Sequence, residues 1–409
     1  MKLKYLAKHI DERHVDEYTE LLSVSKIKGV VPRSEVSDNQ GRADDISHYK
    51  TCKPNDLVIN RMAAYQGALG VAKQFGAISP DYMVLRFQEP MDPRYVGHLF
   101  KSAYMANEMS SRVKGIGSIE SGSVRTPRLS WSDLGEVAVN VPTVEEQKAI
   151  ADFLDVSLLK IDQLVEAQKS LKLAAGERRK ALLEGLTLGG IDPNVTLKQT
   201  GVKWLPEIPE HWEMVPASFV FGNRTEKCLS SDVHLTPSQT YGVVPQSEYM
   251  KITGNRVVLN IAGKEDMRHV EPGDFISHLR SFQGGLEYSS YKGKVSAAYT
   301  VLKPVREISH GYFKYLLKSP RYIQALSTTT EQLRDGQSIR YPQIKMLKLP
   351  FPPVEEQETI SRVLSEKLPV YERIIEKSLE LEKILLEHRQ ALISEAIMGK
   401  LDIGGSANG

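Results

Sequence analysis

The chain has 409 residues, too many for one ordinary hydrophobic core, so two or more domains are expected. Charged residues make up 25% and hydrophobic residues 41% of the chain, a composition typical of a soluble globular protein. A net charge of only +2 excludes a basic field over the whole molecule, so any nucleic-acid surface must be local.

The cysteines and the N-terminal residues indicate the cellular compartment of the protein. Cys52 and Cys228 lie far apart without metal-ligand spacing, which favours a reduced protein. The first residues, MKLKYLAKHIDERH, lack the apolar segment of a signal peptide, and no apolar run reaches the ~18 residues of a membrane span. These features predict a cytoplasmic protein.

The first part of the chain, residues 1–142, mixes β-type runs with turns. Strands are expected at 25–32, 54–60 and 83–87, with a further strand from Asp133 to Val141. The pattern between Pro93 and Ser111 is helical instead, with Tyr95 and Leu99 on one face. We therefore predict an α+β domain of ordinary size.

A long helix is predicted next, over residues 143–190. Thr143-x-x-Glu146 has the capping-box pattern, in which the hydroxyl and the carboxylate satisfy N–H groups at a helix start. Leu188-Gly-Gly is a stop signal. The connector that follows, residues 201–213, holds two prolines and two tryptophans, which indicates a packed segment rather than a flexible tether.

The helix start returns later in the chain. VPTVEEQKAIADFLD from Val141 reappears as FPPVEEQETISRVLS from Phe351, 210 positions on, and the match continues without a gap to Asp192 and Asp402. A gapless match of this length indicates an internal repeat. A second long helix is therefore predicted in residues 353–409, which Pro369 should kink or break.

Both helices carry apolar residues in steps of four and three. A 3.5-residue period is typical of a helix that packs along another helix. The expected seam residues are Ile150, Leu154, Ile161, Leu164, Leu171, Ala175 and Leu182, and Ile360, Leu364, Tyr371, Ile374, Leu381, Leu385 and Leu392. Polar residues at matched heights, such as Gln168 and Ser378, interrupt both seams. We expect the two helices to pack on each other.

Residues 191–352 repeat the first domain after the connector. Gly29-Val-Val-Pro-Arg-Ser-Glu returns as Gly242-Val-Val-Pro-Gln-Ser-Glu, and Tyr65-Gln-Gly returns as Phe282-Gln-Gly. Lys101-Ser likewise returns as Lys318-Ser. The predicted order is therefore domain, helix, domain, helix, which makes one chain a pseudo-dimer. Helices of roughly 30–44 residues span about 45–65 Å, enough to separate two readers of DNA.

Local charge is consistent with a DNA surface. Residues 94–128 carry six bases against two acids, a net charge of +4, and residues 314–348 carry seven against two, a net charge of +5. Phosphate binding needs such patches, although a solvated helix face explains them equally well.

Forked donors and amides on loops are the groups that read bases. The candidates are Arg33, Ser34, Arg61, Tyr65, Gln66, Arg112, Lys114 and Arg125 in the first domain, and Gln246, Ser247, Arg280, Phe282, Gln283, Arg334, Gln337 and Arg340 in the second. Matched positions hold different residues, as two half-sites of different sequence would require. For any single residue, a turn or surface contact is the more ordinary explanation.

Catalytic and metal motifs are not found. No Walker A loop occurs, and the histidines lack ligand spacing. Ser79-Pro-Asp-Tyr82 is only weakly similar to the loop of amino-methyltransferases, and its repeat partner Ser296-Ala-Ala-Tyr299 favours the beginning of a strand.

With these motifs in view, the chain resembles the DNA specificity subunit of type I restriction-modification enzymes. The two Pro-x-Val-Glu-Glu-Gln helix starts, the Gly-Val-Val-Pro-x-Ser-Glu pair and the segment Trp204-Leu-Pro-Glu-Ile-Pro-Glu-His-Trp212 carry the resemblance. It implies two target-recognition domains separated by two long antiparallel helices, a coiled-coil spacer with an internal pseudo-twofold repeat.

The resemblance also implies the function and the partners. The chain would be non-catalytic, bind double-stranded DNA at a split asymmetric site, and dock two modification (methyltransferase) subunits and restriction (translocase-nuclease) subunits. S-adenosylmethionine, ATP and Mg are expected only in those partners. Two alternatives stay open: an enzyme whose site is not recognisable, and an orphan or scaffold coiled-coil protein without a specificity role.

Overall fold

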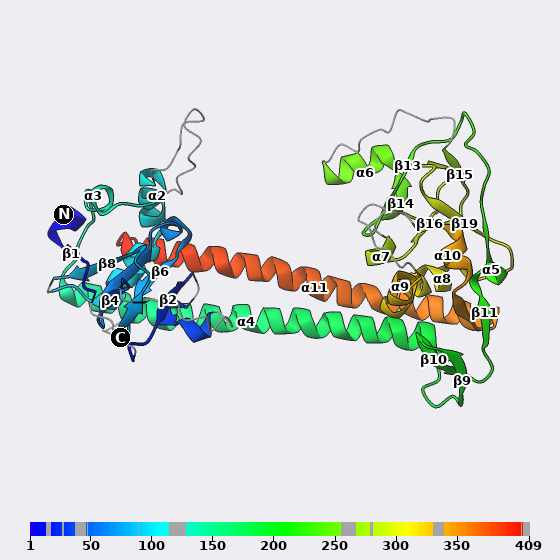
Figure 1. Cartoon of the computed structure of the whole chain (residues 1–409), viewed down its shortest axis with the longest axis horizontal. Helices are drawn as coiled ribbons and strands as arrows, with labels where there is room; N and C mark the ends of the chain where they lie inside the picture. The colour runs from blue at the N-terminus through cyan, green and yellow to red at the C-terminus, as the bar shows by residue number, and fades with distance from the viewer. Residues whose placement is uncertain are drawn as a thin grey trace. The chain divides into compact units, whose positions relative to one another are not determined.

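The computed structural model describes residues 1–13, 18–26, 28–36, 46, 48–88, 90–113, 128–254, 267–278, 281–329, 339–401 and 403. The chain forms two compact units (Figure 1). Unit 1 consists of Met1–Lys169 and Leu379–Gly409, and unit 2 of Ser170–Ser378. Each unit therefore contains one domain together with part of each long helix, α4 (Val144–Gly189) and α11 (Val354–Ile397).

Unit 1 is built on an antiparallel sheet with the order β1-β8-β5-β6. Its strands are β1 (Ala7–Ile10), β8 (Tyr82–Phe87), β5 (Leu57–Asn60) and β6 (Leu69–Val71). Two strand pairs accompany it, β2 (Leu22–Ser25) with β3 (Gly29–Pro32) and β4 (Lys50–Cys52) with β7 (Gly76–Ile78). The helices are η1 (Leu3–Tyr5), η2 (Arg33–Glu35), η3 (Ala64–Gln66), α1 (Pro93–Lys101), α2 (Ala103–Arg112) and α3 (Trp131–Leu134). Figure 1 shows the strands β1, β4, β6 and β8 of unit 1 beside the beginning of α4 and the end of α11.

Unit 2 repeats this architecture. Its four-stranded antiparallel sheet, β12-β19-β16-β17, consists of β12 (Phe221–Asn223), β19 (Thr300–Pro304), β16 (Phe275–Ser277) and β17 (Glu287–Tyr288). The pairs β13 (Leu235–Ser238) with β14 (Gly242–Pro245) and β15 (Arg268–Val270) with β18 (Gly293–Val295) match the two pairs of unit 1. The predicted repeat of an α+β domain is confirmed.

The remaining elements of unit 2 are short helices and two further strand pairs. The helices are α5 (Ala217–Val220), α6 (Gln246–Thr253), α7 (Ser281–Gly284), α8 (His310–Leu316), α9 (Pro320–Ser327) and α10 (Tyr341–Lys345). The strand pairs are β9 (Leu197–Val202) with β10 (Leu205–Pro209) and β11 (Glu213–Pro216) with β20 (Lys348–Phe351). The predicted packed connector is thus a hairpin, and Trp212 just beyond it is fully buried.

The ends of α4 follow the sequence signals. Thr143 N–H donates to Glu146 Oε2 at 2.8 Å, and Glu146 N–H donates to Thr143 Oγ1 at 3.3 Å, so the capping box is formed. At the other end Gly190 has φ +84°, a left-handed conformation that favours glycine. A Cβ at Gly190 would also lie 3.0 Å from Glu356 Oε1.

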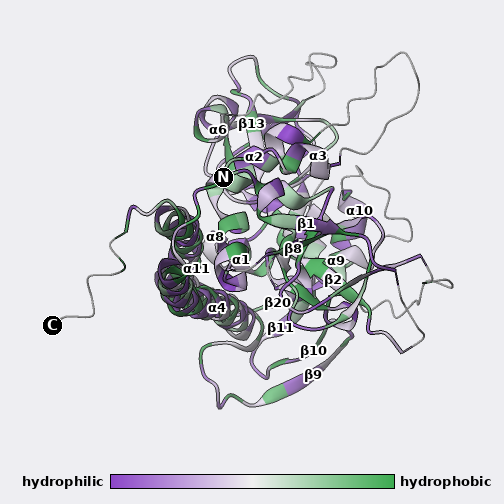
Figure 2. Ribbon diagram, turned by 90° about the vertical axis from the view of Figure 1, so that its left-hand side faces the viewer, coloured by the Kyte–Doolittle hydropathy of each residue, from purple (hydrophilic) through white to green (hydrophobic). Residues whose placement is uncertain are grey.

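The two long helices pack together within each unit. In unit 1 Leu154, Leu158 and Ile161 of α4 belong to the same core as Ile393 and Ala396 of α11. In unit 2 Arg179 of α4 pairs with Glu372 of α11 at 2.8 Å, and Gly190 lies against Glu356, so the segments run antiparallel there. Figure 2 shows hydrophilic and hydrophobic residues on both ribbons.

The predicted seam is wrong at three positions. Leu164, Leu171 and Leu381 are 51%, 47% and 40% exposed. The burial continues from Ile161 by a step of four to Val165, which is only 6% exposed, rather than by a step of three to Leu164. Because alternating steps keep one face toward the neighbour, a single misplaced step moves the next leucine to the outside. Gln168 and Ser378 are at seam positions, as predicted.

Two other predictions concern single segments. Pro369 does not break α11, which is continuous from Val354 to Ile397, and a kink at Pro369 stays a prediction. Its turn is solvent-exposed, so water can satisfy the carbonyl that proline leaves without a donor. Asp133 to Val141 contains the end of α3 and one isolated bridge, Lys2 with Ala138, where a strand was predicted.

Candidate nucleic-acid interface

The loop after β5 positions the predicted residues Tyr65 and Gln66 in unit 1. They belong to the single turn η3, which Gly67 closes with φ +85°. Gln66 Nε2 donates to the Tyr65 hydroxyl at 3.0 Å, and Lys26 Nζ donates to Gln66 Oε1. Tyr65 is 37% exposed. The loop after β5 and Lys26, which lies between β2 and β3, thus bring a hydroxyl, an amide and an ammonium group together.

This loop forms one wall of a cavity of about 390 Å³ within unit 1. Its other walls come from α1, α2 and α11. The polar side chains that line it are Lys26, Tyr65, Gln66, Lys101, Asn107, Arg389 and Gln390. The cavity therefore joins two predicted DNA-binding residues to three cationic side chains that the prediction did not include.

Lys101 is the most deeply placed of these cations. Burial lowers the pKa of its ammonium group, Arg389 lowers it further, and Asp162 partly opposes this. Arg389 itself is held by Asp162, its Nε donating to Oδ1 at 2.9 Å. The sequence contained a signal for both residues, because Lys101 matches Lys318 and Arg389 matches Arg179 in the repeat.

The other candidates of unit 1 lie apart from this cavity. Arg33 and Ser34 are on η2. Arg61 Nε donates to the Leu129 carbonyl at 2.7 Å, and Arg112 forms an ion pair with Glu108 and donates to its carbonyl at 3.0 Å. Internal contacts therefore occupy both guanidinium groups. Lys114 and Arg125 lie outside the described residues.

Two of the basic residues in the stretch 94–128 form ion pairs with acids outside it. Arg94 contacts Asp152 at 2.5 Å and Asp155 at 3.3 Å, both on α4. Arg128 contacts Asp81 at 2.9 Å. These acids lie outside the stretch whose charge was counted, so the net local charge is smaller than the sequence indicated.

Unit 2 places its described candidates on three elements. Gln246 and Ser247 begin α6, Gln283 is exposed on α7, and Arg340 precedes α10. The Arg340 backbone N–H donates to Gln343 Oε1 at 2.8 Å, which forms part of a helix cap. Arg280, Arg334 and Gln337 lie outside the described residues, as does the side chain of Phe282.

The counterpart of Lys101 in unit 2 is neutralised. Lys318 Nζ lies 2.6 Å from Glu287 Oε2, and Glu287 is fully buried. Glu287 pairs with Ile276 across the sheet, whereas Gly70 takes the matching place opposite Val58 in unit 1. A Cβ at Gly70 would lie 2.9 Å from Gly29 Cα, so unit 1 has no room for the same carboxylate.

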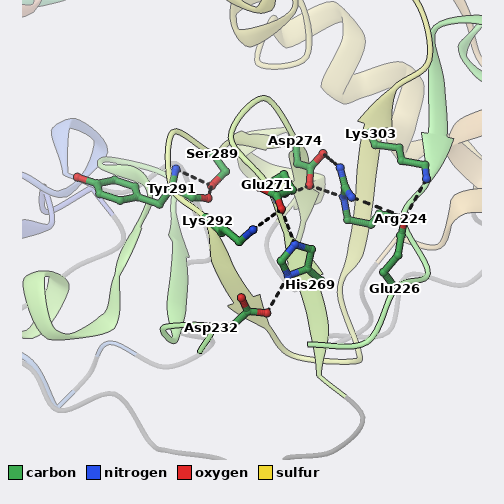
Figure 3. Close-up of polar contacts among 10 residues, drawn as sticks. All are labelled: Arg224, Glu226, Asp232, His269, Glu271, Asp274, Ser289, Tyr291, Lys292 and Lys303. Carbon is green, nitrogen blue, oxygen red and sulfur yellow. Dashed lines mark hydrogen bonds and ion pairs between the residues drawn. The ribbon is translucent and has the colours of Figure 1, made fainter. Parts of the chain in front are cut away.

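A polar network fills another part of unit 2 (Figure 3). Arg224 donates to both oxygens of Asp274 at 2.7 and 3.0 Å. His269 lies between two carboxylates, with Nδ1 2.7 Å from Asp232 and Nε2 2.7 Å from Glu271. Lys292 Nζ donates to Glu271 at 2.9 Å. Each charged group in this network has a partner, which fits a structural role.

Two further observations concern metal binding and membrane insertion. In the part of the chain that the structure describes, no three His, Cys, Asp or Glu side chains come together as a metal site would require. Among the described helices, none has the length and apolar character needed to cross a membrane.

Comparisons with known proteins point to one group. The chain is 21% identical over 293 residues to a putative type I restriction enzyme MjaX specificity subunit from Methanocaldococcus jannaschii. That match covers 69% of this chain and 63% of the relative, less than two thirds of its length. No protein-family model matches the chain.

Solved structures show the same likeness over nearly the whole chain. The HsdS subunit from Thermoanaerobacter tengcongensis aligns with a TM-score of 0.52 at 14% identity, covering 98% of this chain and 96% of that one. A chain from work on complex assembly and conformational transition of the type I R-M system aligns with a TM-score of 0.65 at 14% identity, covering 98% and 97%. The chain therefore has the fold of the specificity subunits of type I restriction-modification systems, the family that its sequence resembles.

Proposed function

We propose that this protein is a sequence-specific DNA-binding subunit of a type I restriction-modification complex, and that it reads a bipartite asymmetric site. The observation that carries the proposal is the repeat of one sheet topology with different chemistry at matched positions. Lys101 faces a cavity in unit 1, whereas Lys318 is neutralised by Glu287 in unit 2. Two readers built on one frame but carrying different groups suit two different half-sites.

The parts of the chain take distinct roles in this proposal. Residues 1–142 and the later domain within 191–352 are the two target-recognition domains. The helices in 143–190 and 353–409 separate them and set the unread gap in the DNA. The DNA-binding residues proposed are Arg33, Ser34, Arg61, Tyr65, Gln66, Arg112, Lys114, Arg125, Gln246, Ser247, Arg280, Phe282, Gln283, Arg334, Gln337 and Arg340.

Partner subunits complete the complex. Both long helices expose large apolar side chains, among them Val156 and Leu159 of α4 at 55% and 60%, and Ile384 of α11 at 51%. Exposed apolar stripes on helices suit docking of further helices. We propose that two methyltransferase subunits and the restriction subunits assemble on this chain. They would hold S-adenosylmethionine, ATP and Mg, and the chain itself would be non-catalytic and cytoplasmic.

Selection from random double-stranded DNA tests the proposal. The full chain, with and without its methyltransferase subunit, is incubated with the pool, and bound DNA is sequenced. We expect enrichment of one asymmetric site made of two short words with a gap of constant length. Recovery of unenriched DNA would favour a scaffold without a specificity role. DNA cleavage or methylation by the purified chain alone would overturn the non-catalytic assignment.

A further inference from the structure

The cavity of unit 1 differs from an ordinary surface hollow in its charge. Lys26 and Lys101 both line it, and neither forms an ion pair with any residue that the structure describes. Arg389 adds a third cation, which Asp162 balances at 2.9 Å. Within the described part of unit 1, Lys26 and Lys101 thus have no carboxylate partner, and they line a place partly removed from water, where electrostatic attraction is stronger than at an open surface.

Neutral donors surround these cations. The side-chain amides of Asn107 and Gln390 and the hydroxyl of Tyr65 line the same cavity. Tyr65 accepts a hydrogen bond from Gln66, and no residue that the structure describes accepts a hydrogen bond from the Tyr65 hydroxyl. Ala103 and Ala106 come from the first turns of α2, a ten-residue helix whose dipole favours negative charge at that end. Ammonium, amide and hydroxyl groups together are the donors that phosphate oxygens accept from.

The comparison with unit 2 shows that this charge is a property of one repeat. Lys318 occupies the place of Lys101 but lies 2.6 Å from the buried Glu287 carboxylate and donates to the Gln239 carbonyl at 3.1 Å. Gln239 in turn occupies the place of Lys26. In unit 2, therefore, Glu287 pairs with the lysine that matches Lys101, and the uncharged Gln239 replaces Lys26.

We infer that the cavity lined by Lys26, Tyr65, Gln66 and Lys101 binds a phosphate group, and that this is a backbone phosphate of the DNA bound by unit 1. The inference rests on the proposed function, because the DNA is the source of the phosphate. Lys101 and Lys26 then contact the DNA backbone and not the bases. Such contacts fix the position of the first domain on the DNA and add no preference for a base sequence. Burial lowers the pKa of Lys101, and a phosphate bound beside the ammonium group would oppose that shift.

The salt dependence of DNA binding tests the inference. Wild type and Lys101→Met, each as the full chain with its methyltransferase subunit, are titrated with duplex DNA over a range of salt concentrations. Losing one phosphate contact should reduce the slope of log K against log salt by about 0.9 and weaken binding about eightfold near 0.1 M salt, equally for all sequences. Lys101→Arg should keep the wild-type slope.

Two further variants serve as controls. Lys148→Met removes an exposed lysine of α4 that does not line the cavity, and its slope should equal that of wild type. Lys26→Met changes an exposed side chain, so it tests the cavity even if Lys101→Met does not fold, and it should also reduce the slope. Unchanged slopes in both cavity variants would overturn the assignment to DNA.

A measurement with inorganic phosphate separates two questions. The first is whether the cavity binds phosphate at all, and the second is whether DNA supplies that phosphate. The thermal unfolding midpoint of the chain alone is measured in phosphate and in chloride at equal ionic strength, for wild type and Lys101→Met. Phosphate could raise the unfolding midpoint of wild type only, while the salt slopes of DNA binding stay unchanged in the cavity variants. That result would support phosphate binding in the cavity and identify a free phosphate compound, rather than DNA, as the ligand. No protection and unchanged slopes would overturn the inference. If wild type binds no DNA at all, the proposed function fails, and the phosphate measurement still decides whether the cavity binds an anion.

Discussion

At the residue scale, one buried glutamine explains the repeated helix-start motif. Gln147 Oε1 accepts from the Asp92 N–H at 2.9 Å, while its Nε2 donates to the Pro142 carbonyl at 3.0 Å. Gln357 makes the same two bonds, to Ser309 at 2.9 Å and Pro352 at 2.8 Å. Both glutamines are almost fully buried. A buried amide satisfies one donor and one acceptor at once, which no apolar side chain and no ionised acidic side chain of that size can do.

The neighbouring acid in the motif has different partners in the two copies. Glu146 completes the capping box with Thr143. Glu356 follows Pro353, which has no hydroxyl, and accepts from Trp212 Nε1 at 2.9 Å instead. The same residue type in the same local sequence therefore anchors a helix start in unit 1 and the connector in unit 2.

A pH dependence is expected from His269. Burial alone lowers the pKa of its imidazole, but hydrogen bonds to Asp232 and Glu271 outweigh burial and raise the pKa above 6.5. Only the imidazolium can donate to both carboxylates. Since the folded pKa lies above the unfolded one, this stabilisation is fully present below about pH 6.5 and is lost as pH rises through the raised pKa.

The measurement is the free energy of unfolding at intervals from about pH 6 upward. Wild type should lose the His269 contribution over that window, and His269→Gln should be less stable than wild type at the acid end, with the difference between them shrinking as pH rises. His388→Gln changes an exposed histidine of α11 and should keep the wild-type profile. A wild-type profile in His269→Gln would show that another group titrates.

At the element scale, the face of α4 that packs inward is decided by its 3.5-residue steps. Leu158 is 6% exposed and belongs to the core of unit 1, whereas its neighbour Leu159 is 60% exposed. The same step pattern appears 210 positions later, where Leu368 is 3% exposed. Two ion pairs at matched positions connect α4 and α11. Arg389 pairs with Asp162 in unit 1, and Arg179 pairs with Glu372 in unit 2.

Truncating adjacent leucines tests this face. Leu158→Ala should lower the free energy of unfolding by about 2–5 kcal/mol, since it removes buried methyl groups and leaves a cavity. Leu159→Ala should change it by no more than about 0.5 kcal/mol. Chemical denaturation of the two variants provides both values. Equal effects would mean that the inward face of α4 has been misassigned.

At the scale of the whole molecule, the proposed function makes the paired helices a ruler for the DNA. Inserting four residues in each helix at matched positions adds about 6 Å, close to two base pairs. The gap between the selected half-sites should therefore lengthen while the two words stay the same. Sequencing of DNA selected by the extended chain measures the gap. An insertion in the β9–β10 turn, which leaves the helices unchanged, is the control, and a constant gap in both proteins would exclude the helices as spacer.

Much of this architecture was predictable because its signals are local or repeated. Capping residues, the stop at Leu188-Gly-Gly and the internal match all depend on neighbouring residues or on direct comparison of the chain with itself. They predicted two similar α+β domains and two long helices, which the structure confirms. Local sequence also indicated that Tyr65 and Gln66 lie on a loop.

The sequence by itself thus determined the repeat, the helix ends and the resemblance to type I specificity subunits. Only the tertiary structure decided which helix faces are buried and which cations have a carboxylate partner. Lys101 and Lys318 have the same neighbouring serine in the sequence, yet Glu287 neutralises one while the close approach of Gly70 to Gly29 denies the other a carboxylate. The reason is physical: burial and ion pairing depend on groups brought together from distant parts of the chain, whereas capping and periodicity depend on residues within one or two turns.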